Sequence, residues 1–424
     1  MSTLLKYLKV FAILIASFFA FSVLSCLIPG KCVQKNIEKS LPELLEEGNY
    51  PKVILKGKQY MQDNFTDALI LNIVVSSGFK PPVQSAMENT HFSQYPDDTV
   101  FCYTIKHLDY KLKNMDLSPN GIYSRYWFGS AAVCRILLLI MNYQDIKWLF
   151  CIVSTLLLLI FAVKIVNKAG WIKSLPLFLA LLFANFFVTQ FSIQFFPVIA
   201  IALIGGIIMC DHGQKPIPKL SMHLFVIGMF TAYFDLLTTP LLTLGLPLLV
   251  YMILQSEEDK SMGKILISIS ILCLSWLIGF ACAWTSKWGL AAVFTDSNAI
   301  GAMDAIIWRI TDRGSRWSAI VRNVTQLPLV WLNTVLCVYL LLTFLNFNKK
   351  RIKWAIAFLI VGLFPYIWYF ILSGHSIPHW WFTYRLQILS MGSVMSALVA
   401  LIDWERLNSK LKTIRAFFTN FTTK

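Results

Sequence analysis

Apolar residues in this chain of 424 residues gather in long blocks that short polar segments separate. A block of about 20 apolar residues is the length that an α-helix needs to cross a bilayer, whereas membrane β-barrels show strands of roughly ten residues with alternating character. The pattern therefore predicts an all-α, polytopic membrane protein with about ten transmembrane helices. We expect spans at residues 10–28, 148–166, 174–190, 192–210, 221–237, 240–255, 265–284, 326–345, 354–372 and 386–402.

The composition excludes a soluble domain, because 57% of the residues are hydrophobic and only 14% are charged. The formal net charge of +15 then indicates anionic lipid headgroups and phosphorylated lipids as partners, and no nucleic acid. The nine cysteines form no CxxC pair and mostly lie inside apolar blocks, which gives little metal or redox signal. Only Cys32 and Cys102 lie in a long loop, and whether they pair is left open.

The basic residues predict the orientation, since Lys and Arg near the ends of spans stay in the cytoplasm. One face collects eighteen of them, whereas the short joints of the other face, near residues 190, 238 and 373–385, contain only Arg385. Both termini are therefore expected in the cytoplasm, with the first span retained, in an inner (cytoplasmic) membrane. Two long extracytoplasmic loops follow, at residues 30–146 and 285–325, and residues 403–424 form a basic cytoplasmic tail. The eighteen basic residues lie within positions 6–9, 164–173, 215–219, 260–264, 349–353 and 406–424.

The first long loop contains apolar-periodic stretches at residues 37–48 and 50–75, which are typical of amphipathic helices lying at the membrane interface. Asp63 and Asp67 are four residues apart and would share one face of a helix. A carboxylate at this border can act as a general base toward a sugar hydroxyl. The alternative is structural, with Asp63 capping the helix and Asp67 pairing with a nearby arginine.

Farther along the same loop, the string YSRYWFG places Arg125 among the aromatic residues Tyr123 and Trp127, and Arg135 follows in an apolar stretch. Guanidinium groups pair with phosphate oxygens, while aromatic faces stack on sugar rings. This segment is therefore a candidate for binding a phosphate (Arg125, Arg135) and a sugar or lipid (Tyr123, Trp127). An interfacial aromatic belt is the alternative.

Asp235 lies at the end of the fifth expected span, where an ionisable side chain is costly and usually has a partner or a function. Either it is catalytic, or it forms a salt bridge with Arg125 or Arg135. In the second long loop, Arg309, Arg313 and Arg316 have helical spacing, so one helix face would present a row of guanidiniums to a phosphate group or to bulk anionic lipid.

The last extracytoplasmic joint, residues 373–385, combines two histidines, several aromatic residues and one arginine. Arg385, with a hydrogen bond from His375 or His379, is a candidate for binding a phosphate, and Trp381 for contacting the sugar or lipid. Pro378 interrupts the helix that would bring His375 and His379 together, and zinc needs three or four ligands. No metal site is therefore predicted.

Taken together, the strings DNFTDALILNI, YSRYWFGS, YFDLLTTPLLTLGLP and GHSIPHWWFTYR, in this order of spans and loops, resemble the GT-C superfamily of polytopic glycosyltransferases. The resemblance covers the architecture of most of the chain. It implies a catalytic carboxylate at Asp67 or Asp63 and a carrier-phosphate arginine at Arg125, Arg313 or Arg385. The chain departs from the family in having no Asp-x-Asp or Glu-x-Asp in the first loop, where Asp97-Asp98 is a bare dipeptide.

The resemblance further implies an inverting, metal-independent transfer of a sugar from a polyprenyl-phosphate carrier to an acceptor glycan of the cell envelope, such as O antigen, teichoic acid or capsule. The only cofactor-like molecule is then the lipid-linked donor itself. A flippase or exporter, or a polymerase, of lipid-linked glycans remains an alternative. The hypothesis requires Asp67, Arg125, Asp235 and Arg385 to meet in one pocket.

Overall fold

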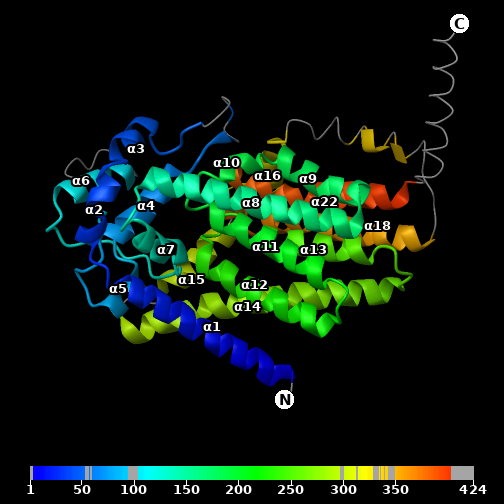
Figure 1. The fold of residues 1–424 in the computed structure, drawn as a ribbon, viewed down its shortest axis with the longest axis horizontal. Helices are drawn as coiled ribbons and strands as arrows, with labels where there is room; N and C mark the ends of the chain where they lie inside the picture. Colours follow the sequence, from blue (N-terminus) through cyan, green and yellow to red (C-terminus); the bar gives the residue numbers. More distant parts are fainter. Residues whose placement is uncertain are drawn as a thin grey trace, which may run out of the picture.

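The computed structural model describes residues 3–402 except 53–56, 58–59, 94–103, 297–299, 312–313, 328–333, 335, 339 and 342–348. The described part is built from α-helices and short 3-10 turns, and it contains no named strand. Figure 1 shows a bundle of long, roughly parallel helices with a group of short helices gathered at one end. The expectation of an all-α architecture is confirmed.

Within the described residues, six segments are long and apolar enough to cross a membrane. Three further expected spans fall on shorter apolar helices, α9 (Trp171–Phe183), α11 (Phe196–His212) and α13 (Leu241–Gln255). Most of residues 326–345 lies outside the described residues, so the count of ten remains a prediction. The chain is a multi-pass helical membrane protein. The six segments are α1 (Thr3–Ser25), α8 (Tyr143–Ala169), α12 (Ile217–Phe234), α14 (Met262–Phe294), Arg351–Ile371 and Trp380–Leu401.

We refer to helices α2 to α7 as the loop domain, which forms the group at the end of the bundle (Figure 1). Its central helix is α4, whose residues Ala68 and Ile70 to Val75 are all buried. The sequence suggested an interfacial helix here, but the neighbouring helices α2, α6 and α7 cover α4 on several sides. The loop-domain helices are α2 (Gly30–Glu38), α3 (Leu41–Glu47), α4 (Asn64–Val75), α5 (Pro82–Glu88), α6 (Thr104–Lys113) and α7 (Gly129–Leu137).

The second long loop is partly helical. Helix α14 has 33 residues, about 50 Å at 1.5 Å per residue, so it exceeds the roughly 30 Å hydrocarbon core and continues to the loop domain. Helices α15 (Ile300–Ile310) and α16 (Arg316–Val324) follow. They connect α14 to the C-terminal helices α18 (Lys349–Gly362), α19 (Phe364–Ile371) and α22 (Gln387–Leu401).

Helices α12 and α14 pack backbone against backbone at two glycines. A Cβ added to Gly228 would lie 2.2 Å from the carbonyl oxygen of Trp276, and one added to Gly279 would lie 2.1 Å from that of Phe225. Such distances leave no room for a side chain, which is the usual way that small residues let membrane helices approach closely. The contact fixes the position of α12 along α14.

We therefore predict that Gly279→Ala destabilises the protein, because the added methyl group must push the two backbones apart, at a cost of about 1–3 kcal/mol. Gly289 lies in the same helix with no heavy atom within 4 Å of an added Cβ, so Gly289→Ala is the matched control. Thermal unfolding in detergent should show a lower midpoint for Gly279→Ala only. Equal midpoints for the two variants would contradict this packing.

Candidate functional site

Asp63 is the N-cap of α4. Its carboxylate accepts hydrogen bonds from the backbone N–H of Thr66, at 3.0 Å, and from the Thr66 hydroxyl, at 2.8 Å. Burial raises the pKa of Asp63 to about 7, against the lowering effect of these two hydrogen bonds. The structural alternative considered from the sequence, a helix cap, is what the geometry shows.

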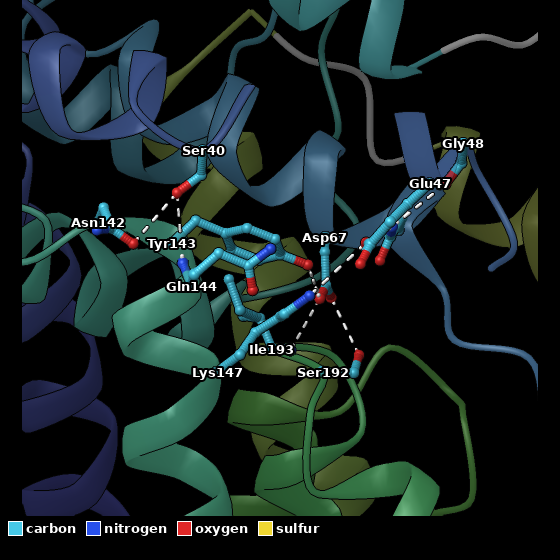
Figure 2. Close-up of polar contacts among 11 residues, drawn as sticks. Ser40, Glu47, Gly48, Asp67, Asn142, Tyr143, Gln144, Lys147, Ser192 and Ile193 are labelled. Atoms are coloured by element: carbon cyan, nitrogen blue, oxygen red, sulfur yellow. Dashed lines mark hydrogen bonds and ion pairs between the residues drawn. The ribbon is translucent and has the colours of Figure 1, made fainter. Parts of the chain in front are cut away.

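Asp67, one turn farther along α4, is fully buried and accepts four hydrogen bonds. The Tyr143 hydroxyl and the Ile193 N–H donate to Oδ2 at 2.9 and 3.0 Å, and the Ser192 hydroxyl and the Gln194 N–H donate to Oδ1 at 3.1 and 3.0 Å. Figure 2 shows Tyr143 of α8, and Ser192 and Ile193 of the segment before α11, reaching Asp67. We call this arrangement the Asp67 node.

Two opposing effects set the pKa of Asp67, namely burial of the carboxylate and the hydrogen bonds donated to it. Desolvation raises the pKa of Asp67 to about 6, while the donors and the ammonium group of Lys147 favour the charged form. Lys147 is itself held 3.7 Å from Glu47, a residue of α3 (Figure 2). Since both oxygens of Asp67 accept two hydrogen bonds each, the carboxylate joins the loop domain to the bundle. Its suggested role as a general base stays a prediction.

Asp235 offers a different environment. It follows the last residue of α12, and its Oδ1 accepts hydrogen bonds from the backbone N–H and the hydroxyl of Thr238. The side chain is buried, and Oδ2 has no hydrogen-bond partner among the described residues. None of the ion pairs formed between described residues includes Asp235, so the salt bridge that the sequence left open is not observed.

Two arginines flank the ring of Tyr126. The guanidinium carbons of Arg309 and Arg125 lie 5.8 and 5.9 Å from the ring centroid, and Arg309 Nη2 donates to the Tyr126 hydroxyl at 2.7 Å. Burial raises the pKa of the Tyr126 phenol, the arginines lower it and Asp235 raises it, which places Asp235 within electrostatic range of the same ring. Neither arginine forms an ion pair among the described residues.

His375 joins this group from the short helix α20 (Ser373–Ser376). Its Nε2 lies 2.9 Å from the carbonyl oxygen of Leu237, which only accepts, so Nε2 carries the proton and Nδ1 keeps a lone pair. Burial, His379 and Arg309 all lower the pKa of His375 well below its usual range, so the ring is neutral. Gly374 makes the placement possible, because an added Cβ would lie 2.5 Å from the carbonyl oxygens of Trp308 and Thr311 at the end of α15.

We call Arg125, Tyr126, Asp235, Arg309 and His375 the polar cluster. Several of its side-chain atoms are buried and have no hydrogen-bond partner in the described part of the chain. Neighbouring hydroxyl groups of α20 share this property. These atoms are Arg125 Nε, Asp235 Oδ2, Arg309 Nε, His375 Nδ1, Ser373 Oγ and Ser376 Oγ.

Arg385 lies in a separate, aromatic environment. Its guanidinium carbon is 5.0 Å from the ring centroid of Phe195 and 5.1 Å from that of Tyr384. The rings of Phe195 and Trp381 are 6.3 Å apart. Because Phe195 directly follows Gln194, the Asp67 node fixes the backbone that supports Arg385. Asp67, Arg125, Asp235 and Arg385 are thus divided among three neighbouring environments, so the single pocket that the sequence hypothesis required is not observed among the described residues.

The remaining candidates have structural contacts. Arg135 is buried and donates to the Ser25 hydroxyl and to the Ile73 carbonyl, which braces α1 against α4. The Trp127 indole N–H donates to the Ala283 carbonyl at 2.8 Å, whereas the Tyr123 ring lies 4.2 Å from the guanidinium carbon of Arg125.

The expected row of guanidiniums assumed one continuous helix, but α15 ends at Ile310, and α16 begins at Arg316. Arg309 and Arg316 therefore belong to different helices. Arg313, Asp97, Asp98 and Cys102 lie outside the described residues.

An apolar groove runs beside α22. Its volume is about 260 Å³, and its lining includes Gln387, Met391 and Val394 of α22 together with Tyr366 of α19. The lining residues on α22 extend from Gln387 to Leu398, about 16 Å at 1.5 Å per residue. Gln387 lies two residues after Arg385, so one end of the groove is close in sequence to a buried cation.

The sequence did not single out Tyr126, Ser373 or Ser376. Tyr126 belongs to a run of aromatic residues, and such a run is also expected where a chain meets the membrane interface, so nothing distinguished it. The two serines flank Gly374 and His375. This compact run of Ser, Gly and His at the end of an expected span was the sequence feature that could have indicated them. Among the described residues, no three His, Cys, Asp or Glu side chains gather to hold a metal ion.

Comparison of the chain with protein-family models, with curated proteins and with solved structures gives no significant match.

We predict that Asp67→Asn destabilises the protein, because an amide replaces one acceptor oxygen with a donor and leaves buried donors without an acceptor. Each such donor costs about 1–3 kcal/mol. Asp63→Asn removes the other carboxylate of α4 but keeps the helix cap, since Asn caps as well as Asp, and serves as the control. Thermal unfolding in detergent should show a lower midpoint for Asp67→Asn than for Asp63→Asn. The opposite order would refute the described role of the Asp67 node.

Proposed function

We propose that the protein is a membrane glycosyltransferase that moves a sugar from a polyprenyl-phosphate-linked donor to a glycan acceptor of the cell envelope. The observation that carries the proposal is the polar cluster. It combines a buried carboxylate that has one unengaged oxygen with two guanidiniums that no described carboxylate neutralises. Buried polar atoms without a partner call for an explanation, and a ligand that supplies the missing bonds provides one here.

The chemistry assigns one role to each charge. Asp235 Oδ2 takes the proton of the acceptor hydroxyl, whose oxygen then attacks the anomeric carbon of the donor sugar. The bond between that carbon and the phosphate oxygen breaks, and the phosphate leaves with the electron pair. Arg309 and Arg125 stabilise its negative charge, and the His375 Nδ1 lone pair accepts a hydrogen bond from a sugar hydroxyl.

The apolar groove supplies the place for the lipid chain. Its lining is mainly apolar, it lies along a membrane-spanning segment, and its Gln387 end is two residues from Arg385. A long isoprenoid chain in the groove would bring its phosphate toward the end nearest Arg385, in the environment that neighbours the polar cluster. The loop domain lies at one end of the bundle and the joint between α13 and α14, which contains a basic residue, lies at the other, which agrees with a site on the extracytoplasmic side (Figure 1).

We predict that Asp235→Asn lowers the turnover number of sugar transfer by about 10²- to 10⁴-fold, because the amide cannot accept the proton. The KM for the donor should change much less, since the phosphate contacts stay. Asp304→Asn, an exposed carboxylate on α15, is the matched control. The measurement is transfer from a radiolabelled polyprenyl-phosphate sugar by the purified protein in detergent.

An active Asp235→Asn variant would exclude Asp235 as the base. If the parent protein, reconstituted in vesicles, moves lipid-linked glycans across the vesicle membrane without transferring sugar, it is a flippase, and the proposed function is wrong. Mass spectrometry of envelope glycans from cells with and without the gene identifies the acceptor and distinguishes single-sugar transfer from polymerisation.

We also predict that Val394→Trp, which fills the groove, raises the KM for a long-chain donor about tenfold or more. A donor with a short chain should be affected little, because it does not reach along α22. Ile278→Trp places the same indole at an exposed position of α14, outside the groove, and should leave both KM values unchanged. A Val394→Trp variant with equal KM changes for both donors would place the lipid chain elsewhere.

A further inference from the structure

Lys287 is a fully buried lysine near the end of α14 that lies within 4 Å of no described carboxylate. Its ammonium group donates to the carbonyl oxygens of Ala86 and Met87, both at 2.8 Å, and lies 5.6 Å from the ring of Trp127. Ala86 and Met87 belong to the last turn of α5. Lys287 therefore attaches the end of α5 to α14, with a cation at the negative end of the α5 dipole.

The residues that follow this attachment hold the loop that carries Arg125 and Tyr126. The Glu88 carbonyl accepts from the Tyr123 N–H at 2.7 Å. The Asn89 side chain donates to the Tyr123 carbonyl at 3.2 Å and to the Tyr126 carbonyl at 2.7 Å. Asn89 reaches both because its backbone is left-handed, with φ of 48°.

The same part of α14 holds the loop from its other side. The indole N–H groups of Trp284 and Trp288 both donate to the carbonyl oxygen of Arg125, at 2.8 and 3.0 Å. The backbone of Arg125 is thus fixed, while its guanidinium lies over the Tyr123 ring with Nε unengaged among the described residues. Within this network, Arg125 has a fixed backbone and a side chain able to bind an anion.

We propose that Lys287 is a positioning residue, which docks α5 on α14 and thereby sets the loop that presents Arg125 and Tyr126 to the phosphate of the donor. The proposal rests on the proposed function for the identity of the anion. The attachment itself is independent of it. This positioning role explains why a buried ammonium group is retained at residue 287. An apolar side chain there would avoid the cost of desolvation but could not bond to the end of α5.

The chain offers a matched control in Lys111. This lysine is also fully buried, donates to two backbone carbonyl oxygens, those of Met115 and Leu117, and lies 4.1 Å from the ring of Phe79. It closes the end of its own helix, α6, and none of these contacts involves the polar cluster. Lys287→Met and Lys111→Met remove the same chemical group from equivalent surroundings.

The test compares the two variants in the full-length protein, first by hydrogen exchange of a peptide covering residues 121–129. Lys287→Met should lose about tenfold or more of the amide protection there, and Lys111→Met should not. The donor KM should rise by a similar factor for Lys287→Met, with a much smaller change in turnover number. Lys287→Gln, which keeps two N–H donors on a side chain one atom shorter, should recover part of the protection and of the KM.

Equal protection and equal donor KM in the Lys287→Met and Lys111→Met variants would overturn the proposal. If Lys287→Met does not fold, Trp288→Phe removes one donor to the Arg125 carbonyl and must raise the donor KM in the same way, or the loop is not held by α14 as proposed. If the parent protein transfers no sugar but Lys287→Met still opens the loop, the proposed function is wrong and the role of Lys287 in placing the loop is supported.

Discussion

The four hydrogen bonds to the buried carboxylate of Asp67 are the interaction on which the arrangement of the site depends. They join α4 of the loop domain to Tyr143 of α8 and to the segment at 192–194. A buried carboxylate is retained only where donors replace its hydration, so this geometry is tightly specified. Phe195 directly follows Gln194, and its ring lies beside the Arg385 guanidinium. The bonds to Asp67 therefore also help to position the last membrane segment relative to the loop domain.

The polar cluster shows the opposite condition. Asp235 Oδ2, Arg309 Nε and His375 Nδ1 are buried without partners in the described residues, and such groups call for an explanation. Backbone strain lies beside them, since Phe128 and Leu237 have φ of 56° and 65°, in the left-handed region that bulky side chains avoid. The two conditions are complementary. The node, whose bonds are satisfied, joins the loop domain to the bundle, and the unsatisfied cluster is where the proposed function places the ligand.

A structural feature could be predicted from the sequence when it depends on residues close together in the chain, and could not when it depends on residues far apart. Apolar block length located nine of the ten expected spans on helices, because crossing a bilayer is a local property of the sequence. The partners of Asp67 lie 76 to 127 residues away, and no spacing rule brings them together. Helical spacing also misled for Arg309 and Arg316, since a helix was assumed to continue past Ile310. For Trp127, an aromatic residue expected to contact ligand instead donates to the Ala283 carbonyl.

Helix α14 explains how a carboxylate and a guanidinium from distant segments keep a fixed separation. At Gly279 its backbone contacts α12, and α12 ends at Phe234, directly before Asp235. Eight residues later, about 12 Å along the axis, Lys287 and the neighbouring tryptophans hold the loop of Arg125. A continuous helix is stiff over this distance. The relative placement of Asp235 and Arg125 is therefore set by one rigid element.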